Sequence, residues 1–169
     1  MPKVERFYLG KQIGTPAARS ERRGGGVPIA TASRSGDMVY TCGVVATDPG
    51  TGQLVGPGDI RAQTRCVLEN LKKVLALAGT SFEHVVLVQA FLKDILSDWR
   101  AYHDVYLEYF DEHRPPPRFT VQAPMVTPDF LVEIQMTAAM PARARAARAR
   151  PARRGAARRP RTGGRSRRR

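Results

Sequence analysis

Apolar and polar residues alternate along two segments near the end of the chain, residues 118–123 and 130–139. This period of two is typical of strands that bury one face. In the second segment Glu133 falls on the polar face, and the opposite face carries Phe130, Val132, Ile134 and Met136. Turn residues at 127–129 join the two segments. The pattern therefore predicts an antiparallel pair that brings Arg118 and Glu133 to the same side of a sheet.

Earlier in the chain the pattern predicts a hairpin and then a helix. Residues 27–33 and 38–45 have the character of strands and are separated by turn residues. Asp59 is a suitable N-cap, and from there apolar residues recur at helical spacing as far as Ala78. Gly79 supplies the stop signal expected after a helix.

A strand and a second helix follow. Residues 84–93 are almost continuously apolar, which predicts a central strand buried on both faces. Asp98 can cap the second helix, in which aromatic and apolar residues recur every three or four positions. We expect this stripe to pack on the sheet; its members are Trp99, Tyr102, Val105, Tyr106, Tyr109 and Phe110.

The order strand, strand, helix, strand, helix, strand, strand predicts a single α+β domain over residues 27–141. Its mixed sheet is covered on one face by the two helices. Several strands are apolar on their second face as well, which predicts a homo-oligomer that buries it. Residues 1–26 are expected to form a flexible leader with one short strand near residues 7–9. Residues 142–169 are expected to form a disordered, Arg-rich tail.

The net charge of +13 comes from this tail. Residues 141–169 hold 13 of the 28 Lys and Arg residues and no acid, so 15 basic residues face 15 acidic ones in the rest of the chain. Cys42 and Cys66 have no metal-site spacing, which indicates a reducing compartment and no bound metal. No apolar run reaches the ~20 residues of a membrane span, so we expect a cytoplasmic protein without a membrane partner.

A set of short motifs between residues 27 and 141 resembles the reactive intermediate deaminase (Rid) family, also called the YjgF family. The motifs are SGDMVYTCG at 35–43, DPGTG at 48–52, QTR at 63–65, LENL at 68–71, VY and YF between 105 and 110, PR at 117–118 and VEI at 132–134. The resemblance implies a homotrimer of chorismate-mutase-like fold with sites in the clefts between subunits. It also implies cofactor-independent hydrolysis of enamine and imine acids to keto acids and ammonia.

The resemblance also implies roles for individual residues. Arg118 matches the arginine that holds the substrate carboxylate, and Glu133 matches the acid that positions water. These types suit the roles, since a guanidinium binds a carboxylate through two nitrogens and a carboxylate can shuttle protons. Gly43 matches a position beside the ligand, where the missing side chain lets backbone groups approach.

Of four further positions that the family places at the ligand, three differ from its usual residues and one agrees with them. Ile29 stands where tyrosine is common, Cys42 where serine is frequent and His103 where asparagine is usual. Thr120 stands where cysteine or threonine is found. A more apolar pocket favours an imine acid other than 2-aminoacrylate, such as an oxidase product or an intermediate of aromatic-ring or pyrimidine breakdown.

Several alternatives remain open at this point. Glu133 could form a structural ion pair, and Cys42 is more readily a small buried residue than a nucleophile because no base lies near it in the motif. The protein could be a noncatalytic member that binds small carboxylates or RNA. The tail could bind polyanions without sequence preference or have no function of its own.

Overall fold

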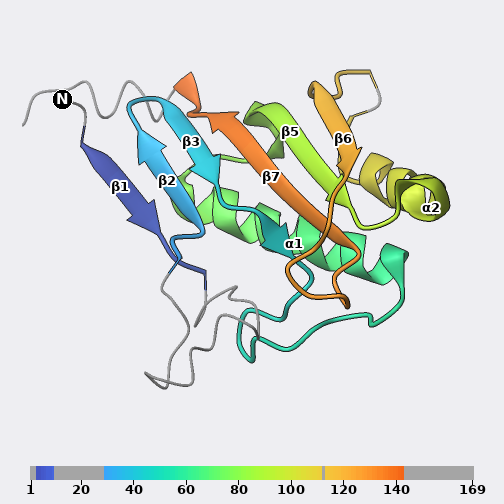
Figure 1. Ribbon diagram of the computed structural model, residues 1–169. Helices are drawn as coiled ribbons and strands as arrows, with labels where there is room; N and C mark the ends of the chain where they lie inside the picture. Colours follow the sequence, from blue (N-terminus) through green and yellow to red (C-terminus); the bar gives the residue numbers. More distant parts are fainter. Residues whose placement is uncertain (1–2, 10–28, 112, 143–169) are drawn as a thin grey trace, which may run out of the picture.

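The computed structural model describes residues 3–9, 29–111 and 113–142, and it contains one seven-stranded mixed sheet (Figure 1). The strands run in the order β1-β2-β3-β7-β5-β6, and the short β4 pairs with β7 as well. Their bounds are Val4–Phe7 (β1), Ala32–Ser35 (β2), Met38–Thr41 (β3), Val44–Val45 (β4), Val85–Leu92 (β5), Arg118–Gln122 (β6) and Val132–Ala139 (β7).

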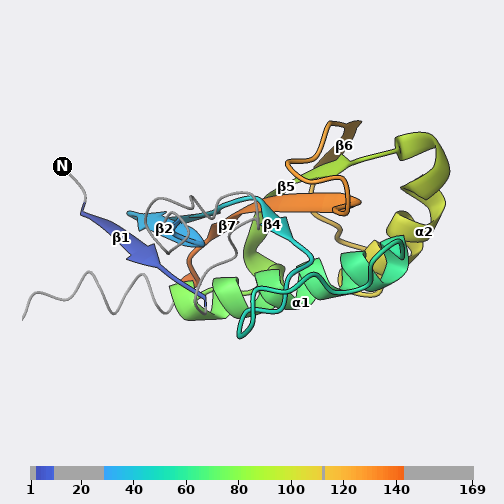
Figure 2. The same ribbon diagram turned by 60° about the horizontal axis from the view of Figure 1, so that its bottom comes forward.

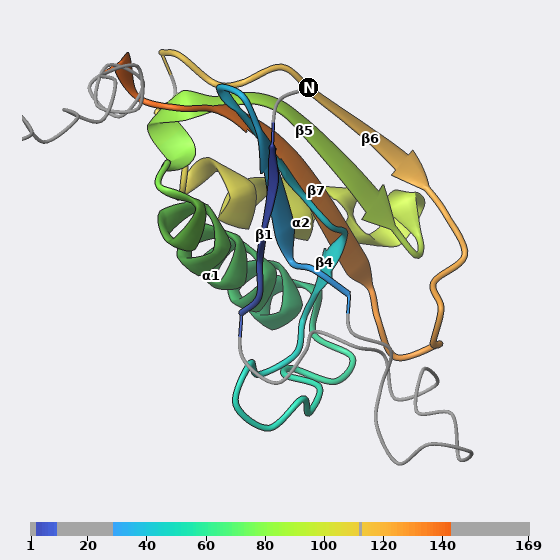
Figure 3. The same cartoon turned by 90° about the vertical axis from the view of Figure 1, so that its left-hand side faces the viewer.

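Both long helices, α1 (Ile60–Ala78) and α2 (Ile95–Leu107), cover the same face of the sheet (Figures 2 and 3). A short 3-10 helix, η2 (Phe82–His84), precedes β5. The core lies between the helices and the sheet, where burial of apolar side chains stabilises the fold. Its fully buried members include Leu68, Leu71, Val74, Val88, Leu92, Ile134 and Met136. The structure therefore confirms the predicted α+β fold.

The helix from residue 60 follows its local signals closely. The Asp59 carboxylate accepts hydrogen bonds from the backbone N–H groups of Arg61 and Ala62, at 2.9 and 3.1 Å. Gly79 ends the helix with φ of 87°, a left-handed conformation that glycine adopts without strain. Both predicted boundaries are confirmed.

The predicted start of α2 at Asp98 is wrong. Asp94 is the N-cap, and its carboxylate accepts from the backbone N–H groups of Leu96 and Ser97 at 3.1 and 3.3 Å. Asp98 lies in the first turn instead. Both aspartates suit a cap, but the chain turns directly after β5 ends at Leu92, so the earlier one takes that place.

The predicted hairpin is present as β2 and β3, which pair from Ala32 opposite Thr41 to Ser35 opposite Met38. The turn is tighter than expected, because Arg34 and Ser35 belong to the strand. Strand β1 pairs with β2 at the edge of the sheet, slightly before the position expected for a strand in the leader. Residues 10–28 and 143–169 lie outside the described part of the chain, so the leader and the tail remain predictions.

The predicted pairing of the last two strands is wrong. Strand β5 lies between them: it pairs in parallel with β6 and antiparallel with β7. Helix α2 carries the chain from β5 to β6, and residues 123–131 carry it across the end of β5 to β7. Backbone bonds from Ala123 to Leu92 and from Lys93 to Leu131, at 3.0 and 2.9 Å, tie that crossing to β5. Turn residues indicate that the chain reverses, but they do not fix which strand becomes the neighbour.

Strand β5 lies inside the sheet but next to the edge strand β6, so the prediction of a central strand buried on both faces is wrong. Val88, Ala90 and Leu92 face the helices and are fully buried. The alternate residues Leu87, Gln89 and Phe91 face away from the helices and are only half-buried. This second face of the sheet is uncovered in the single chain.

Among the described residues, no helix is long and apolar enough to cross a membrane.

Candidate functional site

Arg118 begins β6 and extends beneath helix α2, where three aromatic rings surround its guanidinium group. The guanidinium carbon lies 4.1 Å from the ring centre of Tyr106, 5.2 Å from that of Trp99 and 5.4 Å from that of Tyr102. The three rings lie on one side of the helix because they follow each other at intervals of three and four residues. Such cation–π contacts fix the guanidinium in place and reduce its exposure to water.

His103 contacts the same guanidinium group from α2. Its Nδ1 lies 3.1 Å from Nη2 of Arg118, and its ring stacks on Trp99 with 5.2 Å between ring centres and 7° between planes. Burial and the charge of Arg118 lower the pKa of His103, since both disfavour the protonated ring.

Several buried polar atoms around Arg118 lack a partner. Among the described residues, Nη1 of Arg118 and the hydroxyl groups of Tyr102, Tyr106 and Thr120 form no hydrogen bond of standard geometry, although Thr120 and Arg118 lie close enough to the Tyr102 hydroxyl to oppose the rise in its pKa. Burial raises the pKa of both phenols, so they remain protonated donors. Each unpaired buried group costs about 1–3 kcal/mol. A ligand with an anionic group would satisfy a cluster of this kind.

Glu133 lies in the middle of β7, opposite Val45 on one side and Phe91 on the other. Its side chain is half-buried, and burial raises the pKa of its carboxyl group. Within the described part of the chain no ion pair involves Glu133, so the structural ion pair considered as an alternative is absent there. A raised pKa makes the protonated form of a carboxyl group more available for proton transfer.

Gly43 lies directly against this carboxyl group. A Cβ atom at residue 43 would be 1.7 Å from Oε1 of Glu133. Cys42, the preceding residue, is half-buried, and its thiol pKa is raised to about 11 by burial and by the charge of Glu133. A protonated thiol is a poor nucleophile, so Cys42 fits the interpretation as a small buried residue.

Arg118 and Glu133 lie on opposite faces of the sheet, which corrects the prediction that they share one. Arg118 is aligned with Val88, whose side chain faces the helices. Glu133 is aligned with Phe91, whose side chain faces away from them. Side chains in register across a sheet share a face. The structure thus forms two clusters, with Arg118, His103 and Thr120 on the helix side and Glu133, Gly43 and Cys42 on the uncovered side.

Ile29 belongs to the exposed segment that leads into β2, and 48% of its surface is exposed. Its place at a ligand remains a prediction.

Comparison with known proteins shows the family of the chain. Residues 27–140 match the family model described as Endoribonuclease L-PSP. The chain belongs to the Rid (YjgF) family. It is 40% identical over 111 residues to the RutC family protein PH0854 of Pyrococcus horikoshii, covering 66% of this chain and 86% of that protein. It is equally similar, with the same coverage, to the 3-aminoacrylate deaminase RutC of Acinetobacter baylyi. The Rid-family protein YyfA of Yersinia pestis has the same fold, with a TM-score of 0.64 and 29% identity over 82% of this chain and all of that one.

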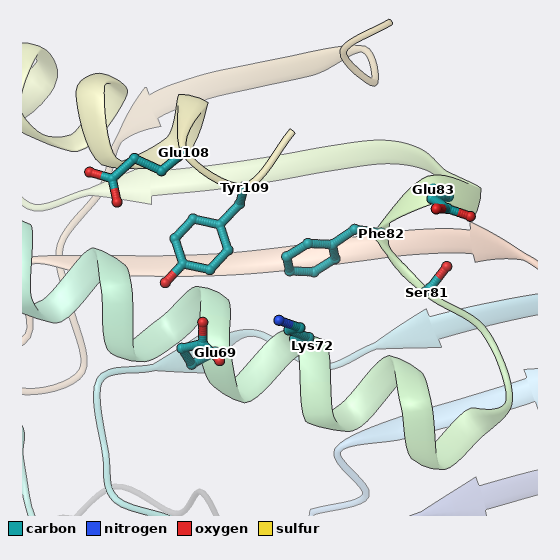
Figure 4. Close-up of a pocket in the computed structure, with 7 residues that line it drawn as sticks. All are labelled: Glu69, Lys72, Ser81, Phe82, Glu83, Glu108 and Tyr109. Atoms are coloured by element: carbon teal, nitrogen blue, oxygen red, sulfur yellow. The ribbon is translucent and has the colours of Figure 1, made fainter. Parts of the chain in front are cut away.

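This Rid-family chain also has an open cleft of ≈ 500 Å³ between α1, η2 and the end of α2 (Figure 4). Its lining contains none of the site residues predicted from the sequence. Glu69, Glu83 and Glu108 line it together with one cation, Lys72. Three carboxylates repel an anionic acid, so the cleft does not suit the carboxylic acids expected for the family.

The sequence did not assign the rings of Trp99, Tyr102 and Tyr106 to this Rid-family site. Their helical spacing predicts that the stripe packs on the sheet, and this accounts for the buried Tyr102 and Tyr106. The spacing alone does not show which strand α2 covers. The pairing of β6 with β5, with Arg118 aligned with Val88, places Arg118 on the face that carries the stripe.

Proposed function

We propose that the protein hydrolyses enamine and imine carboxylic acids to oxo acids and ammonia. The observation that carries this proposal is the guanidinium group of Arg118, held among three rings with Nη1 buried and unpaired. A substrate carboxylate would accept charge-assisted hydrogen bonds from that guanidinium group. The neighbouring hydroxyl groups are further donors. The name of the Acinetobacter relative, a 3-aminoacrylate deaminase, supports an enamine acid as the substrate class.

The reaction needs few groups. Protonation of the enamine at carbon gives an iminium ion, water adds to the iminium carbon, and loss of ammonia leaves the oxo acid. Glu133 is suited to both proton steps, because its raised pKa lets the acid form donate and the carboxylate then accept a proton from water. Arg118 holds the carboxylate, so the reacting carbon stays at a fixed position.

In this proposal the site is made by two copies of the chain, because Arg118 and Glu133 lie on opposite faces of one sheet. The uncovered face offers a surface for such assembly. Strand register places Tyr40, Thr137 and Leu87 in one row, and Phe119 and Val121 are each more than 40% exposed. Packing this face against neighbouring copies would bury it, and we propose a homotrimer with a site at each interface.

Mixing two inactive variants tests the site between copies. Arg118→Ala and Glu133→Gln each remove one half, and joint refolding allows mixed trimers. A site between copies is then complete in about a quarter of random interfaces, so about a quarter of wild-type activity should return. The assay couples an amino acid oxidase, which releases the imine, to semicarbazide trapping. A mixture that stays as inactive as its parents would overturn the two-copy site.

A substrate panel tests the reaction itself. The panel comprises 2-aminoacrylate, 3-aminoacrylate and imines of larger amino acids, because Ile29 removes a hydroxyl group common in the family. If no imine is consumed faster with wild type than with Arg118→Ala, the enzyme proposal fails. A noncatalytic role in binding small carboxylates or RNA would then be preferred. Salt-dependent RNA binding by a chain ending at Pro141 would support the RNA alternative, because that chain lacks the basic tail.

A further inference from the structure

His103 meets the guanidinium group of Arg118 through a single ring nitrogen. The distance from Nδ1 to Nη2 is 3.1 Å, and stacking on Trp99 fixes the plane of the imidazole. A guanidinium group only donates hydrogen bonds. Nδ1 must therefore accept, which requires a neutral ring with its proton on Nε2.

We propose that His103 is a positioning residue for Arg118, and that its neutral ring orients the guanidinium group by accepting from Nη2. Nη1 then remains as the buried nitrogen that meets the substrate carboxylate. The role of His103 toward the substrate rests on the proposed function, whereas its contact with Arg118 does not. The amide oxygen of an asparagine side chain can also accept a hydrogen bond, so asparagine is the conservative replacement for this role.

The charges around His103 make this arrangement sensitive to acid. Arg118 faces it from β6, and Arg100 and Asp104 lie beside it on α2. Asp104 is already shared between Arg100 and Arg61 of α1, at 3.2 and 2.8 Å. Protonation of His103 would remove the acceptor and place two cations in contact, so the clamp loses its orientation as the pH falls.

Trp99 provides a direct reporter, because it is the only tryptophan of the chain and stacks on His103. A protonated imidazole quenches a stacked indole. Wild-type fluorescence should therefore fall with decreasing pH in one transition, with a midpoint below the ordinary histidine value of about 6.5. His103→Asn should abolish this transition, although His84 and His113 remain. A transition that persists in His103→Asn would overturn the proposal.

Removing charges one at a time tests the coupling. Arg118→Met keeps an apolar side chain among the rings and should move the midpoint of the His103 transition to higher pH, since the adjacent cation is gone. Arg100→Met removes an exposed arginine of the same helix and is the matched control, with a smaller shift expected. An unchanged midpoint in Arg118→Met would show that the Arg118 guanidinium group does not contact the His103 ring, and the proposal would fail.

Kinetics test the positioning role. His103→Leu should raise KM about tenfold with a smaller change in kcat, and His103→Asn should stay within about threefold of wild type because it keeps the acceptor. Equal defects in the two variants would overturn the role. Pyruvate, a stable oxo acid, should raise the Trp99 midpoint by placing an anion near His103. If pyruvate has no effect while Arg118→Met still shifts the midpoint, the contact stands and the carboxylate assignment of the proposed function fails.

Discussion

The carboxyl group of Glu133 occupies the space in which a side chain at Gly43 would lie. A Cβ atom there would be 1.7 Å from Oε1, 2.7 Å from Cδ and 3.0 Å from Cγ of Glu133. Because three atoms of the side chain are involved, rotating only the carboxylate cannot relieve the contact. The absence of a side chain at residue 43 thus leaves the space that the proposed acid occupies.

Gly43→Ala should displace Glu133 and lower kcat at least about tenfold, since a misplaced acid no longer meets the substrate. It should also destabilise the fold by about 1–3 kcal/mol through overpacking. The stability cost should largely disappear in a Glu133→Ala background, which removes the colliding atoms. A double-mutant cycle with thermal unfolding measures this coupling. Additive costs would show that residue 43 needs glycine for another reason.

Glu133→Gln should abolish most activity and yet stabilise the fold at neutral pH. The pKa of Glu133 is raised in the folded chain, so the folded state binds the proton more tightly than the unfolded state does. Ionisation therefore costs wild type stability as the pH rises through the unfolded and then the folded pKa. Thermal unfolding from about pH 4 to about pH 8 should show a growing advantage for the Glu133→Gln variant that then levels off.

The exposed Glu83→Gln change controls for the loss of one negative charge in that experiment. If the stability advantage of Glu133→Gln over wild type shrinks as the pH rises, the prediction is contradicted. It would indicate that a cation from a neighbouring copy faces Glu133 in the assembled protein.

Arg118→Met should lower kcat/KM about 1,000-fold, because it removes a desolvated charge that pairs with the ligand. Arg118→Lys keeps a charge without the planar fork and should cost about tenfold to 100-fold. Melting temperatures should stay close to wild type for Met, whose side chain fills the space among the rings. Wild-type kinetics in Arg118→Met would show that the carboxylate binds elsewhere.

Asp94→Ala should destabilise the fold by about 1 kcal/mol, the usual cost of losing an N-cap. In a chain of this size the melting temperature should fall by about 2–4 °C. Asp98→Ala is the matched control and should change stability little, because Asp98 lies inside the first turn. A larger loss for Asp98→Ala would contradict the placement of the cap.

Local signals predicted the elements and their faces well. Asp59 and Gly79 mark both ends of α1, and alternation correctly separated Glu133 from the buried Ile134. The pairing of the last strands could not be predicted in this way. Insertion of β5 between β6 and β7 depends on contacts between residues far apart in the sequence, and the turn at 127–129 contains no information about them. The same insertion placed Arg118 and Glu133 on different faces.

Strand order also governs when this sheet can form. Strand β7 is the last element of the domain, yet it pairs with β3, β4 and β5 and joins the two halves of the sheet. During synthesis the β2–β3 hairpin and the unit β5–α2–β6 emerge before β7. Neither can pair its inner edge strand until β7 is present. The sheet is therefore complete only after β7 has left the ribosome, and premature termination before Val132 leaves two unjoined halves exposed to chaperones and proteases.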